Sequence, residues 1–199
     1  MTIGVLGTGR IATTLAVMFA RGGHEVKIGS SDAQRGRMAA ARLGCAGLSG
    51  GHYEEAVTEA SVVIPAVLGA QGAVQQLRPW RAELRGKILV DVTNPFTGDH
   101  VDFVSPWAAG GAEDLATAFP QARLVGAFKN VWWEAFDGGH DSAVPEISVI
   151  SDDDEAKQKF MRMCAATPFS YADAGGLDQA RRVERMALSG PRSRRLFAA

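Results

Sequence analysis

The sequence predicts an α/β protein with a doubly wound, mainly parallel sheet and a small C-terminal α/β extension. Short apolar runs that end in glycine alternate with segments of helical spacing from the first residues onward, which is the pattern of such sheets. The chain has 199 residues, 46% of them hydrophobic, which is enough for one substantial core. We therefore expect a single domain over residues 1–199, in which residues 129–199 form the extension.

The first two-thirds of the chain alternates strands and helices. Strands are predicted at residues 3–6, 25–28, 61–66, 86–92 and 123–128. Helices are predicted at residues 11–21, 32–43 and 112–119. A further helix is predicted in the segment after residue 66, and it ends at Leu77. Glycines follow the first two helices, as they commonly do at helix ends, and residues 96–111 have the composition of a loop.

The C-terminal extension is expected to contain two more strands and two more helices. The strands are predicted at residues 146–150 and 169–172, and the helices from about 152 to 166 and at 177–188. We expect Ser151 to cap the first of these helices, because Asp152, Asp153 and Asp154 would then lie in its first turn, where the helix dipole favours negative charge. Consecutive acids fan around a helix, so we expect no metal site there.

The turn after the first strand has the sequence Gly7-Thr8-Gly9-Arg10-Ile11-Ala12, a G-x-G-x-x-A motif. The first glycine permits a tight turn, the second lets the backbone approach a pyrophosphate, and the small third residue lets helix pack on strand. The free N–H groups at the helix start then face the anion. Because the motif follows a strand and opens a helix, it predicts a Rossmann-type dinucleotide site; the alternative is an ordinary glycine turn.

The end of the second predicted strand favours NADP over NAD. A carboxylate there would bind the adenosine ribose hydroxyls and repel a 2′-phosphate, but this chain has Ser30 and Ser31, with Arg35 a few residues on. Asp32 is the complication, because a small register shift would place it on the ribose. Arg10 either adds positive charge near the phosphates or is a solvated side chain.

The chain resembles the NADPH-dependent oxidoreductases typified by coenzyme F420:NADP oxidoreductase, whose dinucleotide domain recurs in membrane metalloreductases. The resemblance covers nearly the whole chain. It is carried by residues 3–9, 29–32, 91–95, 125–130, 151–157 and 173–177, followed by Arg182 and Glu184. Of these, the acidic helix start and the Asp173-Ala174-Gly175-Gly176-Leu177 turn are the most discriminating. The chain departs from the family where it has Ser31 in place of an arginine, and Ala66-Val67-Leu68 in place of Ile-Pro-Trp.

The resemblance implies direct hydride transfer between NADP(H) and a second flat carrier, a deazaflavin or a flavin, which needs orientation more than a general acid. It implies that the adenosine and its 2′-phosphate contact Thr8, Ser30, Ser31 and Arg35. It places the nicotinamide beside Ala66, Val67, Leu68, Asn94 and Pro95. It places the second carrier against Lys129, Asn130, Val131, Trp132, Gly175, Gly176 and Leu177.

Two other functions remain open from the residues. The first is an NADPH-dependent reductase of a small imine or carbonyl metabolite, with Lys129, His100 or His140 as proton donor. The second is a non-catalytic NADP-binding redox sensor. A titrating histidine in a loop is only suggestive, so no catalytic residue is assigned.

Composition and the N-terminal residues limit the partners and the compartment. The net charge of −1 gives no reason to expect nucleic acid or an anionic membrane, and no apolar run reaches the length of a membrane span. Cys45 and Cys164 lie far apart without metal-like spacing. The first residues lead directly into a strand, so we expect a cytoplasmic protein with a small-molecule substrate. A homodimer is also expected, in which a partner subunit completes the second-ligand pocket.

Overall fold

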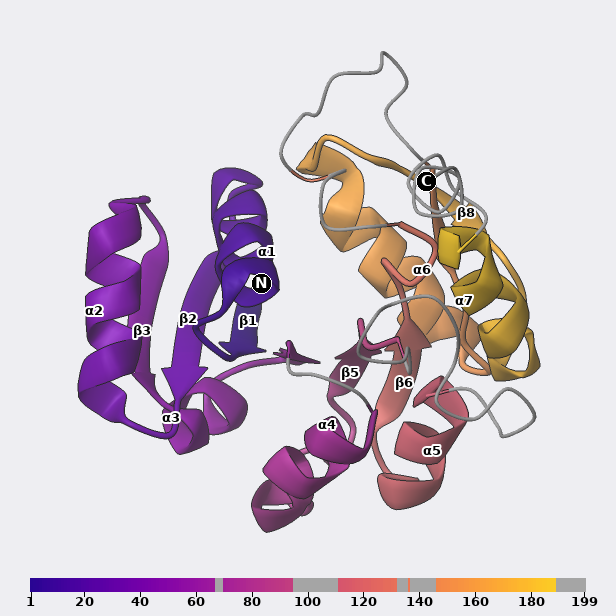
Figure 1. Ribbon diagram of the computed structural model, residues 1–199, viewed down its shortest axis with the longest axis horizontal. Coiled ribbons are helices and arrows are strands. Elements are labelled where there is room, and N and C mark those ends of the chain that lie inside the picture. The colour runs from indigo at the N-terminus through magenta and orange to yellow at the C-terminus, as the bar shows by residue number, and fades with distance from the viewer. Residues whose placement is uncertain (67–69, 95–110, 132–135, 137–145, 189–199) are drawn as a thin grey trace, which may run out of the picture.

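The computed structural model describes residues 1–66, 70–94, 111–131, 136 and 146–188, and its main sheet contains six parallel strands (Figure 1). These strands are β1 (Thr2–Leu6), β2 (Glu25–Ser30), β3 (Leu48–His52), β4 (Val62–Pro65), β5 (Ile88–Asp91) and β6 (Arg123–Gly126). A second parallel pair consists of β7 (Glu146–Val149) and β8 (Ser170–Asp173). The spatial order β3-β2-β1-β4-β5-β6 confirms the predicted doubly wound sheet.

Helices cover both faces of the main sheet (Figure 1). The α-helices are α1 (Arg10–Arg21), α2 (Ala33–Leu43), α3 (Tyr53–Thr58), α4 (Ala70–Leu77), α5 (Gly111–Ala118), α6 (Asp154–Met163) and α7 (Ala180–Leu188). Short 3-10 helices are η1 (Arg78–Trp80), η3 (Cys164–Ala166) and η4 (Leu177–Gln179). The helix predicted to end near residue 166 is therefore α6 plus η3, and the last predicted helix is η4 plus α7.

Neighbouring residues of a central strand point into the apolar clusters on opposite faces of the sheet. This explains why the sequences of these strands are continuous apolar runs. On β4, Ile64 packs in a cluster with Phe19 of α1 and Phe160 of α6. The preceding residue, Val63, packs in a second cluster with Leu115 of α5, which also contains residues of α3, α4 and α7. Parallel strands covered on both faces carry apolar side chains at every position, so they lack the alternation of a half-exposed strand.

β3 and α3 were not predicted from the sequence. β3 contains Gly50 and Gly51, and glycine is depleted in strands. The structure explains Gly50 by a close approach of α2, since a Cβ on Gly50 would lie 2.0 Å from the carbonyl oxygen of Gly36. His52 ends β3 and caps α3 by accepting a hydrogen bond from the backbone N–H of Glu54 at 3.3 Å.

The expected capping role of Ser151 is wrong, because the N-cap of α6 is Asp153. The Asp153 carboxylate accepts a hydrogen bond from the backbone N–H of Ala156 at 2.9 Å. Ser151 lies two residues earlier, where its hydroxyl donates to the carbonyl oxygen of Leu124 at 2.6 Å and accepts from the backbone N–H of Asp153 at 3.0 Å. The serine thus joins the extension to β6, near the antiparallel bridge between Gly126 and Ile150.

We expect Asp153→Ala to lower the free energy of unfolding by about 1–2 kcal/mol near neutral pH, from a lost cap and a lost, partly exposed ion pair. Arg123 donates to both carboxylate oxygens of Asp153, at 2.6 and 2.8 Å, and this pair lowers the pKa of Asp153 to about 2. A lowered pKa means that the charge contributes stability above the ordinary value of 3.8 and loses it as the pH falls toward about 2.

Urea denaturation of the wild type and of Asp153→Ala over a series of acidic pH values measures this effect. Asp153→Asn retains a capping side chain and therefore isolates the ion pair, which we expect to contribute no more than about 1 kcal/mol. If the stability difference between wild type and Asp153→Ala stays constant down to about pH 3, the ion pair does not contribute as proposed.

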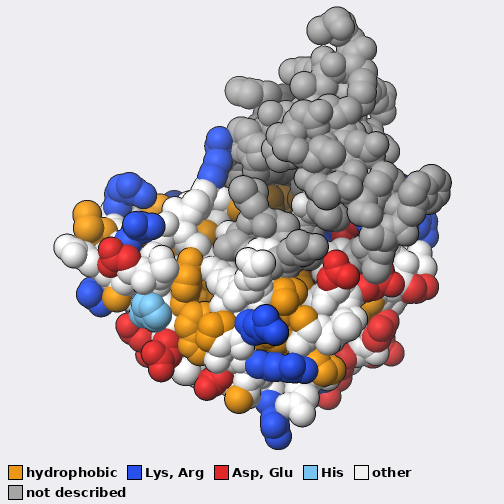
Figure 2. Space-filling view, turned by 60° about the horizontal axis from the view of Figure 1, so that its bottom comes forward, with side chains coloured by type: hydrophobic (Ala, Val, Ile, Leu, Met, Phe, Trp, Pro, Cys, Tyr) orange, Lys and Arg blue, Asp and Glu red, His pale blue; other side chains and the backbone are white. Residues whose placement is uncertain are grey.

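Acidic and basic side chains are mixed over the described surface that Figure 2 shows. Within the described part of the chain, no helix is long and apolar enough to cross a membrane, and no group of three or more metal-ligating side chains gathers. Cys45 and Cys164 are free thiols, and burial raises the pKa of Cys164 to about 12, so this thiol acts as an apolar core residue.

Candidate functional site

The candidate site lies at the edge of the main sheet where its parallel strands end. β2 and β4 flank β1 on opposite sides, so the strand order reverses at β1. Open α/β sheets bind ligands in the crevice at such a reversal, outside the carboxyl ends of the strands. The segments after β1, β2, β4, β5 and β6 therefore supply the residues that a ligand meets.

Gly7 makes the tight turn that ends β1. Its φ of 128° lies in a region that side chains rarely adopt, and its N–H donates to the carbonyl oxygen of Gly29 at 2.9 Å. A Cβ on Gly7 would lie 2.9 Å from the carbonyl oxygen of Ala66 and 3.4 Å from the Cβ of Ala12. Ala12 is itself fully buried, so Gly7 makes a tight turn and the small residue of the motif allows α1 to pack closely on the strand.

Gly9 caps the start of α1 with bare backbone. Its φ and ψ are −76° and 178°, no side chain forms a capping hydrogen bond there, and the first turn carries no acid. A Cβ on Gly9 would meet no atom of the described residues within 4 Å. By contrast, Asp32 caps α2 and Asp153 caps α6. Among the described residues, no side chain thus caps the first amides of α1, a geometry that fits an anionic phosphate.

The residues that follow β2 present a hydroxyl and a guanidinium at the surface, the hydroxyl just after the strand and the guanidinium in the first turn of α2. Ser31 and Arg35 are both exposed, whereas Ser30 is buried and accepts a hydrogen bond from the backbone N–H of Asp32 at 3.3 Å. The Asp32 carboxylate accepts from the backbone N–H groups of Gln34 and Arg35, at 2.8 and 3.3 Å. Oδ1 of the exposed Asp32 is therefore engaged as a helix cap, and the neighbouring Ser31 and Arg35 carry the hydroxyl and the cation that fit a 2′-phosphate.

Asn94 follows β5 at the same edge and has one free amide atom. Its Nδ2 donates to the carbonyl oxygen of Lys129 at 3.0 Å. Its Oδ1 is buried and finds no hydrogen-bond partner among the described residues. A buried acceptor without a partner is costly, so this oxygen is a candidate to receive a hydrogen bond from a bound ligand.

Lys129 does not face a substrate in this structure. Its side chain is 0% exposed, and its ammonium lies 2.5 Å from Asp91 Oδ2 and 3.2 Å from Glu184 Oε1 and donates to the carbonyl oxygen of Thr93. All three N–H groups of an ammonium are accounted for by three such acceptors. The expected roles of Lys129 as a proton donor and a second-substrate contact therefore do not fit its placement, because its ammonium is already engaged by three acceptors of the protein.

Asn130 is likewise engaged within the protein. Its Nδ2 donates to the carbonyl oxygen of Glu146 at 2.8 Å, and its Oδ1 accepts from the backbone N–H of Ser148 at 3.1 Å. The side-chain amide thus ties the end of β6 to the beginning of β7. Other predicted site residues lie outside the described residues, namely Val67, Leu68, Pro95, His100, Trp132 and His140.

The turn at residues 175–177 lies away from the ligand edge. β7 runs antiparallel to β6 where Ile150 pairs with Gly126, so the segments after β7 and after its parallel partner β8 lie toward the beginning of β6. Ser151, which bonds to Leu124 of β6, also donates its N–H to the carbonyl oxygen of residue 175 at 3.0 Å. The structure thus separates Gly175, Gly176 and Leu177 from Lys129 and Asn130, which were also predicted to contact the second substrate.

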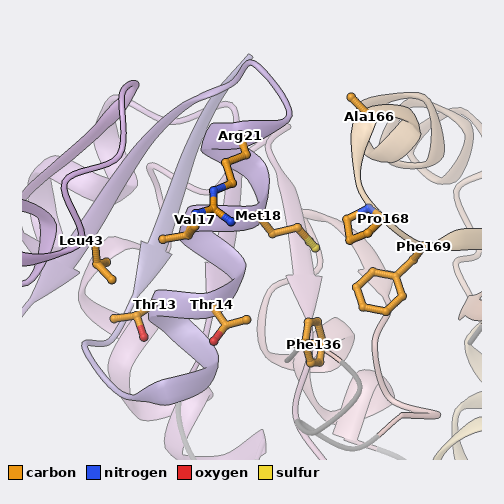
Figure 3. A pocket seen from close by; sticks show the side chains of 10 residues that line it. All are labelled: Thr13, Thr14, Val17, Met18, Arg21, Leu43, Phe136, Ala166, Pro168 and Phe169. Atoms are coloured by element: carbon orange, nitrogen blue, oxygen red, sulfur yellow. The ribbon is translucent and has the colours of Figure 1, made fainter. Parts of the chain in front are cut away.

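A pocket of about 320 Å³ lies between α1 and the extension (Figure 3). Thr13, Thr14, Val17 and Met18 of α1 line one side, and Phe136, Pro168 and Phe169 face them from the other. The hydroxyl of Thr13 donates to the carbonyl oxygen of Gly9 at 3.0 Å, so the pocket begins one helical turn from the bare helix start. Sequence reasoning missed this pocket because its two sides lie more than a hundred residues apart in the chain.

The order of the strands and the bare start of α1 define a Rossmann-type dinucleotide-binding protein. Residues 2–95 match the model of the family described as NADP oxidoreductase, coenzyme F420-dependent. The F420-dependent NADP reductase of Methanothermobacter thermautotrophicus is 30% identical over 200 residues, which cover 94% of this chain and 86% of that protein. The chain belongs to this family of coenzyme F420-dependent NADP oxidoreductases.

Three further comparisons match the chain to proteins that are longer than it. Human metalloreductase STEAP2 is 28% identical over 188 residues, but the chain spans only 36% of its length. The crystal structure of a candidate F420-dependent NADP reductase from Arthrobacter sp. FB24 superposes with a TM-score of 0.79 at 22% identity, covering 93% of this chain and 88% of that one. An imine reductase from Aspergillus terreus, also 22% identical, gives a TM-score of 0.68 and is covered over 62% of its length. These two likenesses show the fold alone.

Proposed function

We propose that this protein is an NADP(H)-dependent oxidoreductase that transfers a hydride between the nicotinamide and a second flat carrier, a deazaflavin such as coenzyme F420 or a flavin. The observation that carries the proposal is the uncapped start of α1 at Gly9, where a Cβ would meet no atom of the described residues within 4 Å. The F420-dependent NADP reductase from Methanothermobacter, matched over most of its length, supports the choice of carrier.

The residues of the site have distinct roles in this proposal. The bare amides of α1 bind the pyrophosphate, and Ser31 and Arg35 bind the 2′-phosphate of the adenosine. When bound, NADPH supplies the hydride from its nicotinamide ring. Asn94 contributes its free Oδ1 on the nicotinamide side of the edge. Hydride transfer between two flat rings depends on their orientation, so these contacts to the dinucleotide are the protein's main contribution.

The burial of Lys129 removes one of the three proton donors expected for a small imine or carbonyl substrate; the other two, His100 and His140, lie outside the described residues. Reduction of an imine or a carbonyl needs a proton donor at the substrate nitrogen or oxygen. The ammonium of Lys129 is enclosed by Asp91 and Glu184, so it does not contact a substrate atom. A hydride passed to a deazaflavin or flavin ring places no such demand on this lysine. A non-catalytic sensor would bind NADP(H) at the same edge and differs only in turnover.

The test is NADPH oxidation by the purified chain with oxidised coenzyme F420, FMN or a cyclic imine as the acceptor. We expect loss of NADPH absorbance with F420 or FMN, and none with the imine. The Gly9→Val variant serves as the control that removes the dinucleotide site. Turnover with the imine alone would overturn the flat-carrier proposal, and tight NADPH binding without oxidation by any acceptor would identify a sensor instead.

A further inference from the structure

A buried cluster of charges lies beside the proposed nicotinamide side of the site. Lys129 joins Asp91, at the end of β5, to Glu184 on α7, and the side chains of all three are 0% exposed. Glu184 Oε1 also accepts a hydrogen bond from the backbone N–H of Gly111, where α5 begins, at 3.1 Å. Arg181 lies 3.2 Å from the other oxygen of Glu184. The cluster thus joins the end of β5, the segment after β6, the start of α5 and α7 at one point.

Stability alone is a poor explanation for this cluster. Desolvation of a buried ion pair often cancels its Coulomb attraction, and apolar replacements of similar volume are often as stable. Burial raises the pKa of Glu184, and the charges of Lys129 and Arg181 oppose that rise. A cluster of this kind is better explained by the geometry that it fixes.

The backbone just before Lys129 is strained. Phe128 has a φ of 59°, in the left-handed region, which costs about 1–2 kcal/mol for a residue other than glycine. Its ring packs against those of Phe136 and Phe169, at centroid distances of 5.6 and 6.3 Å. These rings belong to the core on one face of the sheet, while the next side chain, Lys129, turns to the charge cluster. Strain of this kind persists where the surrounding structure requires a particular geometry, and it gathers at functional sites.

The same lysine fixes the amide of Asn94. Lys129 accepts the Nδ2 hydrogen bond of Asn94 with its backbone oxygen and contacts Asp91 with its ammonium. Asp91 Oδ1 in turn accepts from the backbone N–H and the hydroxyl of Thr93, at 2.8 and 2.7 Å. Hydrogen bonds therefore fix the short segment from Asp91 to Asn94 at both of its ends. Oδ1 of Asn94 is left without a partner among the described residues.

We propose that Lys129 is a positioning residue, and that the Asp91–Lys129–Glu184 cluster holds Asn94 so that its free Oδ1 faces the nicotinamide half of the dinucleotide. Lys129 acts through Asn94 and touches neither the dinucleotide nor the second substrate. The inference rests on the proposed function, because it assumes that the dinucleotide binds at this edge.

The test compares two ligands, NADP⁺ and 2′-phospho-ADP-ribose, which lacks the nicotinamide. In the charge-balanced variant Lys129→Met/Asp91→Asn, we expect the affinity for NADP⁺ to fall about tenfold, the effect of one lost hydrogen bond, with the affinity for 2′-phospho-ADP-ribose unchanged. Removing both charges avoids the unpaired buried carboxylate that Lys129→Met alone would leave. Lys157→Met is the matched control, because Lys157 is also buried and pairs with Asp173 at 2.8 Å, away from the ligand edge.

A double-mutant cycle with Asn94→Ala separates positioning from general stability. If Lys129 acts through Asn94, then Asn94→Ala alone lowers the NADP⁺ affinity as much as the charge-balanced variant does, and the combination is no worse than either. Losses that multiply, or equal losses for both ligands, would overturn the inference. If the wild-type chain binds neither ligand, the proposed function fails instead, so the two failures are distinguishable.

Discussion

Gly9→Val is expected to abolish dinucleotide binding while leaving the fold intact. The backbone of Gly9 has a φ that valine accepts, and a Cβ there would meet no described atom within 4 Å, so the substitution causes no clash within the described residues. The valine side chain would instead fill the space over the first amides of α1. Hydrogen bonds to a charged phosphate contribute about 1.5–3 kcal/mol each, so the loss of two predicts a fall in NADPH affinity of at least about 100-fold.

Calorimetric titration with NADPH measures this loss, and thermal unfolding checks the fold. Gly7→Ala is a poor substitute for this test, because the positive φ of Gly7 and the approach of Ala66 make any side chain destabilising there. A well-folded Gly9→Val protein with the affinity of the wild type would show that the phosphates do not rest on the start of α1.

Arg35→Glu is expected to weaken NADPH binding far more than NADH binding. A guanidinium at the 2′-phosphate contributes about 1.5–3 kcal/mol, so its loss predicts a fall in NADPH affinity of about 10- to 150-fold, and the carboxylate adds repulsion. NADH carries no 2′-phosphate and should lose little. Because Arg35 is exposed, the difference should shrink as salt is added.

Arg42→Glu provides the matched control for this charge reversal. Arg42 is an exposed residue in the last turn of α2, so the variant changes the net charge of the same helix equally, at its far end. We expect the ratio of NADPH to NADH affinity to stay near that of the wild type. Equal losses of both dinucleotides in Arg35→Glu would contradict the assignment of the 2′-phosphate site.

The parallel sheet was predictable because its strands are buried on both faces and its first helices end at glycines. β3 was not predicted because it contains glycines, which are rare in strands. Gly50 is needed there because the backbone at Gly36 of α2 packs closely against it, and this tertiary contact leaves no local sequence pattern. The N-cap of α6 was misplaced by two residues because several polar residues in a row can each cap a helix. Asp153 holds the position because Arg123, thirty residues earlier, also binds its carboxylate.

The dinucleotide half of the site was more predictable than the second-substrate half. A glycine-rich turn is local, so the tight turn at Gly7, the bare helix start at Gly9 and the burial of Ala12 follow from their spacing. The environment of Lys129 depends on Asp91 and Glu184, which come from distant segments of the chain. Lys129 was therefore expected to contact a substrate, whereas the structure encloses its ammonium between these two carboxylates. The expected homodimer and the cytoplasmic location stay predictions.

Calorimetric titration of the wild-type chain with NADPH and with NADH tests the central claim most directly. The claim is that the bare amides at the start of α1 bind the phosphates of a dinucleotide. It predicts saturable binding of NADPH, with an affinity at least about tenfold above that for NADH. Failure of both dinucleotides to bind a folded chain would contradict it.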